Sequence, residues 1–300
     1  MAKRFIASAI SVLAALCAAA CVPGVSTDEY TYLANTSPAE TVAADIPATG
    51  LTPADILDPT QYTNPLYSDP SEAIPLEQVP NPPPRFTIAI DPGHQERGNY
   101  DREPIGPDAS EHKAKVASGT RGTVSGVAEY QLVLDISLQL RDELLARGFN
   151  VVMIRETNDV NISNSERAII ATESGADIFI RVHANGSSNS DANGIMALST
   201  SKDNPFIPNL YSQSRSLSDN MLASMVETTG ARNLGVIEVD NMTGSNWSTV
   251  PVTIVEMGFM TNPTEDMLMQ TDEYQTKLVL GMANGIERYF AEQNKEPTQQ

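Results

Sequence analysis

The sequence is poor in cysteine, histidine and tryptophan, and it has half as many basic residues as acidic ones. Cys17 and Cys21 are the only cysteines among 300 residues, so no disulfide framework can stabilise the chain beyond residue 21. Lys and Arg number 19 against 38 Asp and Glu, which gives a formal net charge of −19. Such an acidic chain is not expected to bind nucleic acid or anionic lipid.

The N-terminal segment has the pattern of an export signal. MAKRFIASAISVLAALCAAA places two basic residues ahead of an uncharged apolar run that is short for a membrane span. The three alanines before Cys21 resemble a bacterial lipoprotein cleavage site, although Ala18 stands where such sites usually carry Leu. We expect residues 1–21 to be a signal peptide and Cys21 to be a lipidated membrane anchor. Ordinary signal cleavage nearby is the alternative, and both predict a location at the cell envelope or outside the cell.

The next 63 residues lack any Lys or Arg. Residues 22–84 hold twelve of the twenty prolines, and acidic residues are scattered throughout. This composition predicts a disordered linker, which would serve as a tether; irregular coil packed on the following domain is the alternative. Residues 293–300 are expected to form a frayed tail.

From residue 85 the pattern becomes that of an α/β domain, in which apolar runs of strand length alternate with amphipathic helical segments. We predict one domain over 85–292, with a mainly parallel twisted sheet flanked by helices. The predicted strands are 85–91, 150–155, 176–182 and 251–256, and the predicted helices are 129–148, 163–175, 206–230 and 272–290.

Two of the three histidines follow predicted buried strands. His94 comes after RFTIAID, His183 after ADIFIRV, and Glu256 closes PVTIV. Because sites in α/β sheets form beyond the carboxyl ends of the strands, these side chains are expected to share one crevice. Glu129 opens the first long helix and could point into the same crevice.

Two imidazoles and one carboxylate are a ligand set of catalytic zinc, which leaves a fourth position for water. We predict His94, Glu129 and His183 as the zinc ligands and Glu256 as a general acid/base. The spacing is not that of HExxH zinc helices, so the residues alone leave an alternative open, in which these are ordinary hydrogen-bonded loop residues.

Four motifs together resemble a known family. IDPGHQ, the EYQL helix start, RVHANG and VPVTIVEMGFMTNPTED occur in this order. They are similar to those of the zinc-dependent N-acetylmuramoyl-L-alanine amidases of the amidase-3 branch, which includes LytC-like and AmiC-like enzymes. The resemblance implies Glu256 as catalytic residue and His94, Glu129 and His183 as zinc ligands. It also implies peptidoglycan as substrate, cleaved between the lactyl group of N-acetylmuramic acid and L-alanine.

Residues 95–128 depart from the family pattern, because they form a long polar stretch between the first two ligands, His94 and Glu129, where the family has a shorter connection. We hypothesise that this stretch borders the crevice and shapes substrate access. His112 within it is expected to be a solvated residue.

Other candidate residues leave alternatives open. Trp247 could stack on substrate or simply pack. Arg155 and Arg167 could bind stem-peptide carboxylates, but ordinary helix or surface ion pairs are the preferred interpretation. Asn185 is expected to form a turn, and the methionines of MLMQ and NMLASM are expected in the core.

Two other functions remain open from the sequence. A zinc peptidase that cuts within the stem peptide would use a similar ligand set. A non-catalytic wall-binding module would not need the four residues, so their joint presence favours an enzyme.

Overall fold

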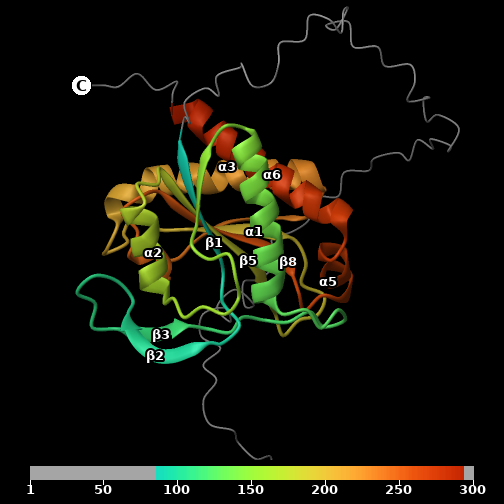
Figure 1. The fold of residues 1–300 in the computed structure, drawn as a ribbon, viewed down its shortest axis with the longest axis horizontal. Helices are drawn as coiled ribbons and strands as arrows, with labels where there is room; N and C mark the ends of the chain where they lie inside the picture. Colours follow the sequence, from blue (N-terminus) through green and yellow to red (C-terminus); the bar gives the residue numbers. More distant parts are fainter. Residues whose placement is uncertain (1–85, 294–300) are drawn as a thin grey trace, which may run out of the picture.

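The computed structural model describes residues 86–293, which fold around one six-stranded sheet (Figure 1). The predicted signal peptide, Cys21, linker and tail lie outside the described residues, apart from residue 293. Among the helices of the described part, none is long and apolar enough to cross a membrane.

The sheet has the strand order β4-β1-β5-β8-β6-β7. Its first four strands run parallel to one another: β4 (Asn150–Met153), β1 (Thr87–Pro92), β5 (Ile178–Asn185) and β8 (Val252–Phe259). β6 (Ile195–Ser199) pairs antiparallel with β8, and β7 (Asn233–Glu238) pairs parallel with β6. The predicted mainly parallel sheet is therefore confirmed, and its carboxyl edge is formed by β1, β5 and β8.

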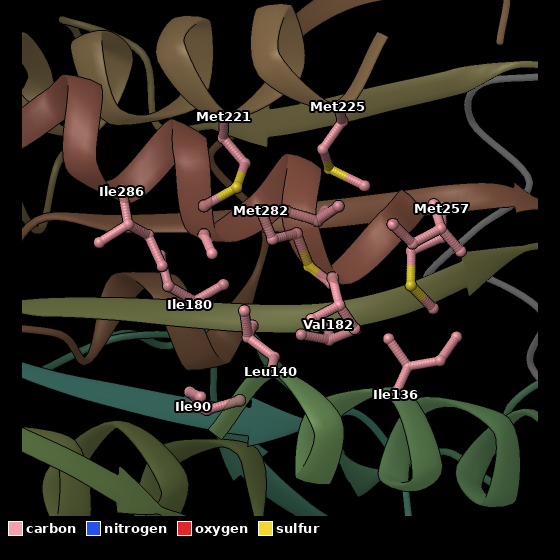
Figure 2. Close-up of a cluster of buried hydrophobic side chains, with 14 of the residues drawn as sticks. Ile90, Ile136, Leu140, Ile180, Val182, Met221, Met225, Met257, Met282 and Ile286 are labelled. Carbon is pink, nitrogen blue, oxygen red and sulfur yellow. The ribbon is translucent and has the colours of Figure 1, made fainter. Parts of the chain in front are cut away.

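One face of the sheet is covered by three long helices: α1 (Glu129–Ala146), α3 (Tyr211–Thr229) and α6 (Asp272–Gln293). Figure 2 shows their apolar side chains meeting Ile180 and Val182 of β5, with α1 contributing Leu140 and α6 contributing Met282. These side chains are fully buried. The predicted helices on this face are confirmed.

The other face packs against α2 (Asn164–Glu173), α4 (Thr243–Asn246) and the short 3-10 helix η6 (Pro208–Leu210). α2 begins with a capping box, in which the Ser163 side chain accepts from the Glu166 amide and the Glu166 carboxylate accepts from the Ser163 amide. A smaller apolar cluster around Phe179 fills this layer.

Residues 95–128 are not a structureless loop. They contain an antiparallel hairpin of β2 (Asn99–Pro104) and β3 (His112–Val116), which lies beside α2 (Figure 1). The buried Glu103 carboxylate attaches this hairpin to α2 by accepting from the backbone N–H and the hydroxyl of Ser165. Four further elements, β6, β7, α4 and α5 (Pro263–Met269), were not predicted from the sequence.

The amino end of β1 is closed by aromatic rings. Phe86 stacks on Phe290 of α6 with ring centroids 3.9 Å apart and planes 6° apart. Phe149, at the entry to β4, and Tyr289 also contact the Phe290 ring. This end of the sheet is opposite the edge where the histidines lie.

Candidate metal centre

The three predicted ligands meet at the carboxyl edge of the sheet. The His94 Nε2 atom lies 3.1 Å from Glu129 Oε1 and 3.2 Å from His183 Nδ1, and the last two atoms are 3.2 Å apart. All three side chains are buried. They are the one group of His, Cys, Asp and Glu in residues 86–293 whose ligand atoms converge closely enough to hold a metal ion.

His94 follows β1 in a tight turn. Its backbone has φ of +60°, in the left-handed region that non-glycine residues rarely adopt. The Nδ1 atom contacts the Ala117 carbonyl oxygen at 2.8 Å. Because a carbonyl can only accept, Nδ1 carries the proton and Nε2 presents its lone pair towards the other two ligands.

Glu129 is the first residue of α1, and backbone groups fix both of its carboxylate oxygens. Oε2 accepts from the Thr120 amide at 2.8 Å, and Oε1 accepts from the Ala184 amide at 3.1 Å. Burial by itself would raise the pKa of Glu129. When the imidazoles are protonated, the charge of His94 and the hydrogen bonds from both histidines outweigh this effect and hold that pKa well below its usual range; with neutral imidazoles, the two backbone amides still favour the carboxylate. Glu129 is therefore ionised.

His183 lies near the end of β5, and its ring stands almost perpendicular to that of His94, with an interplanar angle of 83°. Burial lowers the pKa of His183, so the neutral imidazole that a metal requires is favoured. Gly93 allows the close approach of the two segments, because a Cβ atom there would lie only 2.2 Å from His183 Cε1.

Glu256 lies on β8 and is the register partner of His183 on β5. Register partners on neighbouring strands project their side chains to the same face of the sheet, so Glu256 and His183 share a face. The Glu256 side chain is buried, as are its register neighbours. The structure thus brings a second carboxylate beside the three-residue cluster.

The donor atoms fit a zinc ion. Two N or O ligands at about 2.05 Å from zinc, placed at the tetrahedral angle, lie about 3.3 Å apart. The three separations of 3.1–3.2 Å are close to this value, and the set of two imidazoles and one carboxylate is one that catalytic zinc uses.

The remaining sequence candidates have other positions. His112 is exposed, as expected, and contacts the Ser110 carbonyl. Trp247 packs against the cluster around Phe179 and donates Nε1–H to the Pro104 carbonyl, so its packing role is the one observed. Asn185 is not a turn residue as expected but the last residue of β5; its side-chain oxygen accepts from the Gly186 amide, and its side-chain amide contacts Met196 Sδ.

Two further expectations need correction. Arg155 and Arg167 do not form surface ion pairs, because both are buried beneath the His94 turn. Met267 of MLMQ is 47% exposed and is not a core residue, whereas Met221, Met225 and Met269 are fully buried.

Sequence reasoning missed the backbone groups that orient the ligands. The segment after β3 supplies the Ala117 carbonyl to His94 and the Thr120 amide to Glu129, so residues 95–128 contribute directly to the site. A Cβ atom at Gly119, whose φ is +80°, would lie 2.8 Å from Glu129 Oε2. The glycines in this stretch were the one available signal for such close packing.

Comparison of this chain with known proteins identifies its family. The family model described as N-acetylmuramoyl-L-alanine amidase matches residues 88–288. The chain is 26% identical over 218 residues to the uncharacterized protein YqiI of Bacillus subtilis, covering 72% of this chain and 90% of YqiI. It is 27% identical over 217 residues to the amidase LytC of Bacillus subtilis, covering 71% of this chain but 37% of LytC.

Solved structures show the same fold. The N-acetylmuramoyl-L-alanine amidase from Clostridium difficile 630 superposes with a TM-score of 0.56 at 27% identity, over 69% of this chain and 97% of that one. The amidase Ami1 from Mycobacterium smegmatis gives a TM-score of 0.63 at 24% identity, over 70% of this chain and 98% of that one. The chain therefore belongs to the N-acetylmuramoyl-L-alanine amidase family and is a hydrolase of that class.

Proposed function

We propose that this protein is a zinc-dependent N-acetylmuramoyl-L-alanine amidase whose catalytic domain spans residues 85–292. The proposed reaction is hydrolysis of the amide between the lactyl group of N-acetylmuramic acid and L-alanine of the stem peptide. The observation that carries the proposal is the triangle of donor atoms from His94, Glu129 and His183, with sides of 3.1–3.2 Å.

These three residues would hold the metal. When bound in such a site, zinc acidifies a water molecule towards neutrality and stabilises negative charge on the carbonyl oxygen under attack. The chain prepares the site in advance: the Ala117 carbonyl fixes the His94 tautomer, and the Thr120 and Ala184 amides fix the Glu129 carboxylate.

Glu256 is the proposed general acid/base. Its position in register with His183 supports this role, because it places a carboxylate beside the ligands without belonging to the triangle. In the ionised form it would take a proton from the attacking water. It would then donate that proton to the departing alanine nitrogen, as amide cleavage requires.

Residues 95–128 are the proposed border of the substrate crevice. The contacts of Ala117 with His94 and of Thr120 with Glu129 support this role, because they place part of the stretch directly beside the ligands. We further propose that the protein acts at the cell envelope, held there by a lipidated Cys21 and the linker 22–84. The acidic chain makes such an anchor useful, since anionic wall polymers would repel it.

The first test is the reaction product and its metal dependence. Purified peptidoglycan is digested with the metal-loaded protein, and the products are identified by mass spectrometry. Release of intact stem peptides with a free L-alanine amino group is expected, and removal of the metal with a chelator should abolish it. Peptides cut internally would instead indicate the zinc peptidase, and intact peptidoglycan that co-sediments with the protein would indicate a wall-binding module.

His183→Ala sharpens this test. The variant should lose both bound zinc, measured by elemental analysis, and amide hydrolysis, because two ligands remain. His112→Ala is the matched control, since His112 is exposed, and it should keep both properties. Full zinc content in His183→Ala would contradict the proposed ligand set.

A further inference from the structure

Two buried arginines lie directly under the turn that carries His94. Arg155, just beyond β4, and Arg167, in α2, are 3% and 0% exposed. A guanidinium has five N–H donors, and in each of these residues all five are used. Neither residue therefore has a donor left for a substrate carboxylate.

Arg167 binds the turn from α2. Its donors reach the Ile162, Pro92 and His94 carbonyls, the Asp91 carboxylate and the Gln95 side-chain oxygen. The bond to the His94 carbonyl, 2.8 Å long, helps to hold the left-handed backbone of that residue.

Arg155 connects two ligand-bearing segments. Its Nη2 atom donates both to the Gly93 carbonyl at 2.9 Å and to the Tyr130 carbonyl at 2.8 Å. Gly93 immediately precedes His94, and Tyr130 immediately follows Glu129. A single nitrogen therefore joins the backbone beside one ligand to the backbone beside another.

The other donors of Arg155 fix the guanidinium itself. Nε donates to the Pro92 carbonyl at 2.8 Å, and Nη1 donates to the Thr157 carbonyl and the Asn158 side chain. Burial and the nearby charge of Arg167 lower the pKa of Arg155 to about 10, so the group remains charged at neutral pH. A charged group in such a place needs this complete set of acceptors.

We propose that Arg155 is a positioning residue that sets the distance between His94 and Glu129 by joining the Gly93 and Tyr130 carbonyls. This inference rests on the proposed function, because it assigns the effect to the metal ligands. Lysine could not replace it, since its shorter side chain has no Nε and Nη1 donors to hold the group on Pro92, Thr157 and Asn158 while one nitrogen reaches both carbonyls. Metal affinity and ligand geometry should thus depend on a residue that touches neither metal nor substrate.

The test uses Arg155→Lys in the full chain, with zinc and cobalt(II) as probes. Zinc affinity is measured by competition with a chelator, and ligand geometry by the visible absorption of bound cobalt(II). We expect about 10–100-fold weaker zinc binding, which is the usual effect of losing an outer-shell partner. An altered cobalt spectrum and a lower kcat with unchanged KM should accompany it. Arg141→Lys is the control, because Arg141 forms ion pairs at the surface of α1 with Asp142 and Glu156.

The outcomes separate the two proposals. If the wild-type protein binds neither probe, the proposed function fails. If the wild type binds both and Arg155→Lys matches it in affinity and spectrum, the positioning role is overturned, even where the unfolding temperature falls. Should Arg155→Lys not fold, Asn158→Ala decides, because it removes one acceptor and leaves the arginine. It should shift the cobalt spectrum in the same direction, and an unchanged spectrum would overturn the inference.

Discussion

The two faces of strand β5 differ sharply although their residues alternate along one chain. Ile180 and Val182 enter the apolar cluster under α1, α3 and α6 (Figure 2). Their neighbours Arg181 and His183 are equally buried but lie on the opposite face, where Arg181 donates to Asp91 and to Asn164 of α2. On the first face the side chains pack without polar partners. On the second face, beyond the apolar cluster around Phe179, Arg181 and His183 are held by specific polar partners.

This contrast indicates how the protein combines stability with a precise site. Burial of apolar area is non-directional, so the α1/α3/α6 face can tolerate small shifts of its side chains. Buried charges are costly unless their hydrogen bonds are complete, so the α2 face is stable in very few arrangements. Substitutions on the first face should change stability alone, and those on the second should change either catalysis or cooperative folding.

The largest expected effect is on turnover, in Glu256→Gln. The amide keeps the size of the side chain but cannot accept and return a proton, so kcat should fall about 10²–10⁴-fold. Zinc content and the unfolding midpoint should stay as in the wild type. Glu173→Gln, at the exposed end of α2, is the control. Wild-type turnover in Glu256→Gln would remove the proposed proton transfer.

The next effect is on stability, in Asp91→Asn. The Asp91 carboxylate accepts from Arg167 at 2.6 Å and from Arg181 at 3.0 Å, and all three side chains are buried. Its loss leaves two buried guanidinium charges without their counterion, which should lower the free energy of unfolding by about 3–5 kcal/mol. Denaturant titration measures the change. Asp101→Asn, an exposed residue 4.0 Å from Lys115, should change it little, and equal effects would contradict the assignment.

The pH dependence of stability is a second test of the Asp91 ion pairs with Arg167 and Arg181. Burial would raise the pKa of Asp91, but Arg167 and Arg181 reverse this and hold it well below its usual range. The stability from ionised Asp91 is therefore complete above its unfolded pKa of about 3.9 and is lost as pH falls towards the lower folded value. The unfolding free energy of the wild type should fall more steeply below about pH 4 than that of Asp91→Asn. Parallel curves would show that Asp91 is not the group responsible.

The smallest expected effect is on the free energy of unfolding, in Ile180→Val on the apolar face of β5. Removing one buried methylene should cost about 0.5–1.5 kcal/mol, without change in kcat or zinc affinity of the folded protein. Ile169→Val on α2, where the side chain is 37% exposed, provides the control for the substitution itself. A fall in kcat for Ile180→Val would show that the two faces are not as independent as the structure indicates.

The sequence predicted the parallel core because its strands are continuous apolar runs. It did not predict β6, β7 or the β2–β3 hairpin, for different reasons. β7 is an edge strand with a left-handed glycine, Gly235, and the hairpin strands NYDREP and HKAKV are mostly polar. Their order comes from pairing and from contacts such as Glu103 with Ser165, which no local pattern encodes. By contrast, Asn262 followed by Pro263 is an ordinary helix start that could have predicted α5.

The candidate site was predictable in its residues but not in its support. Strand ends gave His94, His183 and Glu256, and the helix start gave Glu129. The roles of Arg155 and Arg167 could not be found, since Arg167 lies 76 residues from Asp91 and 73 from His94 in the chain. Most arginines are exposed at the protein surface, and only the folded structure shows that Arg155 and Arg167 are buried.

The stacking of Phe86 on Phe290 brings the two ends of the described chain close together. Phe86 is the first described residue and Phe290 lies near the last, so both ends of the described chain leave from the same end of the sheet (Figure 1). The six residues of β1 separate this end from the ligand cluster by about 20 Å. A surface joined directly at Phe86 or at Gln293 would therefore face away from the ligand cluster and leave that edge accessible to a polymer.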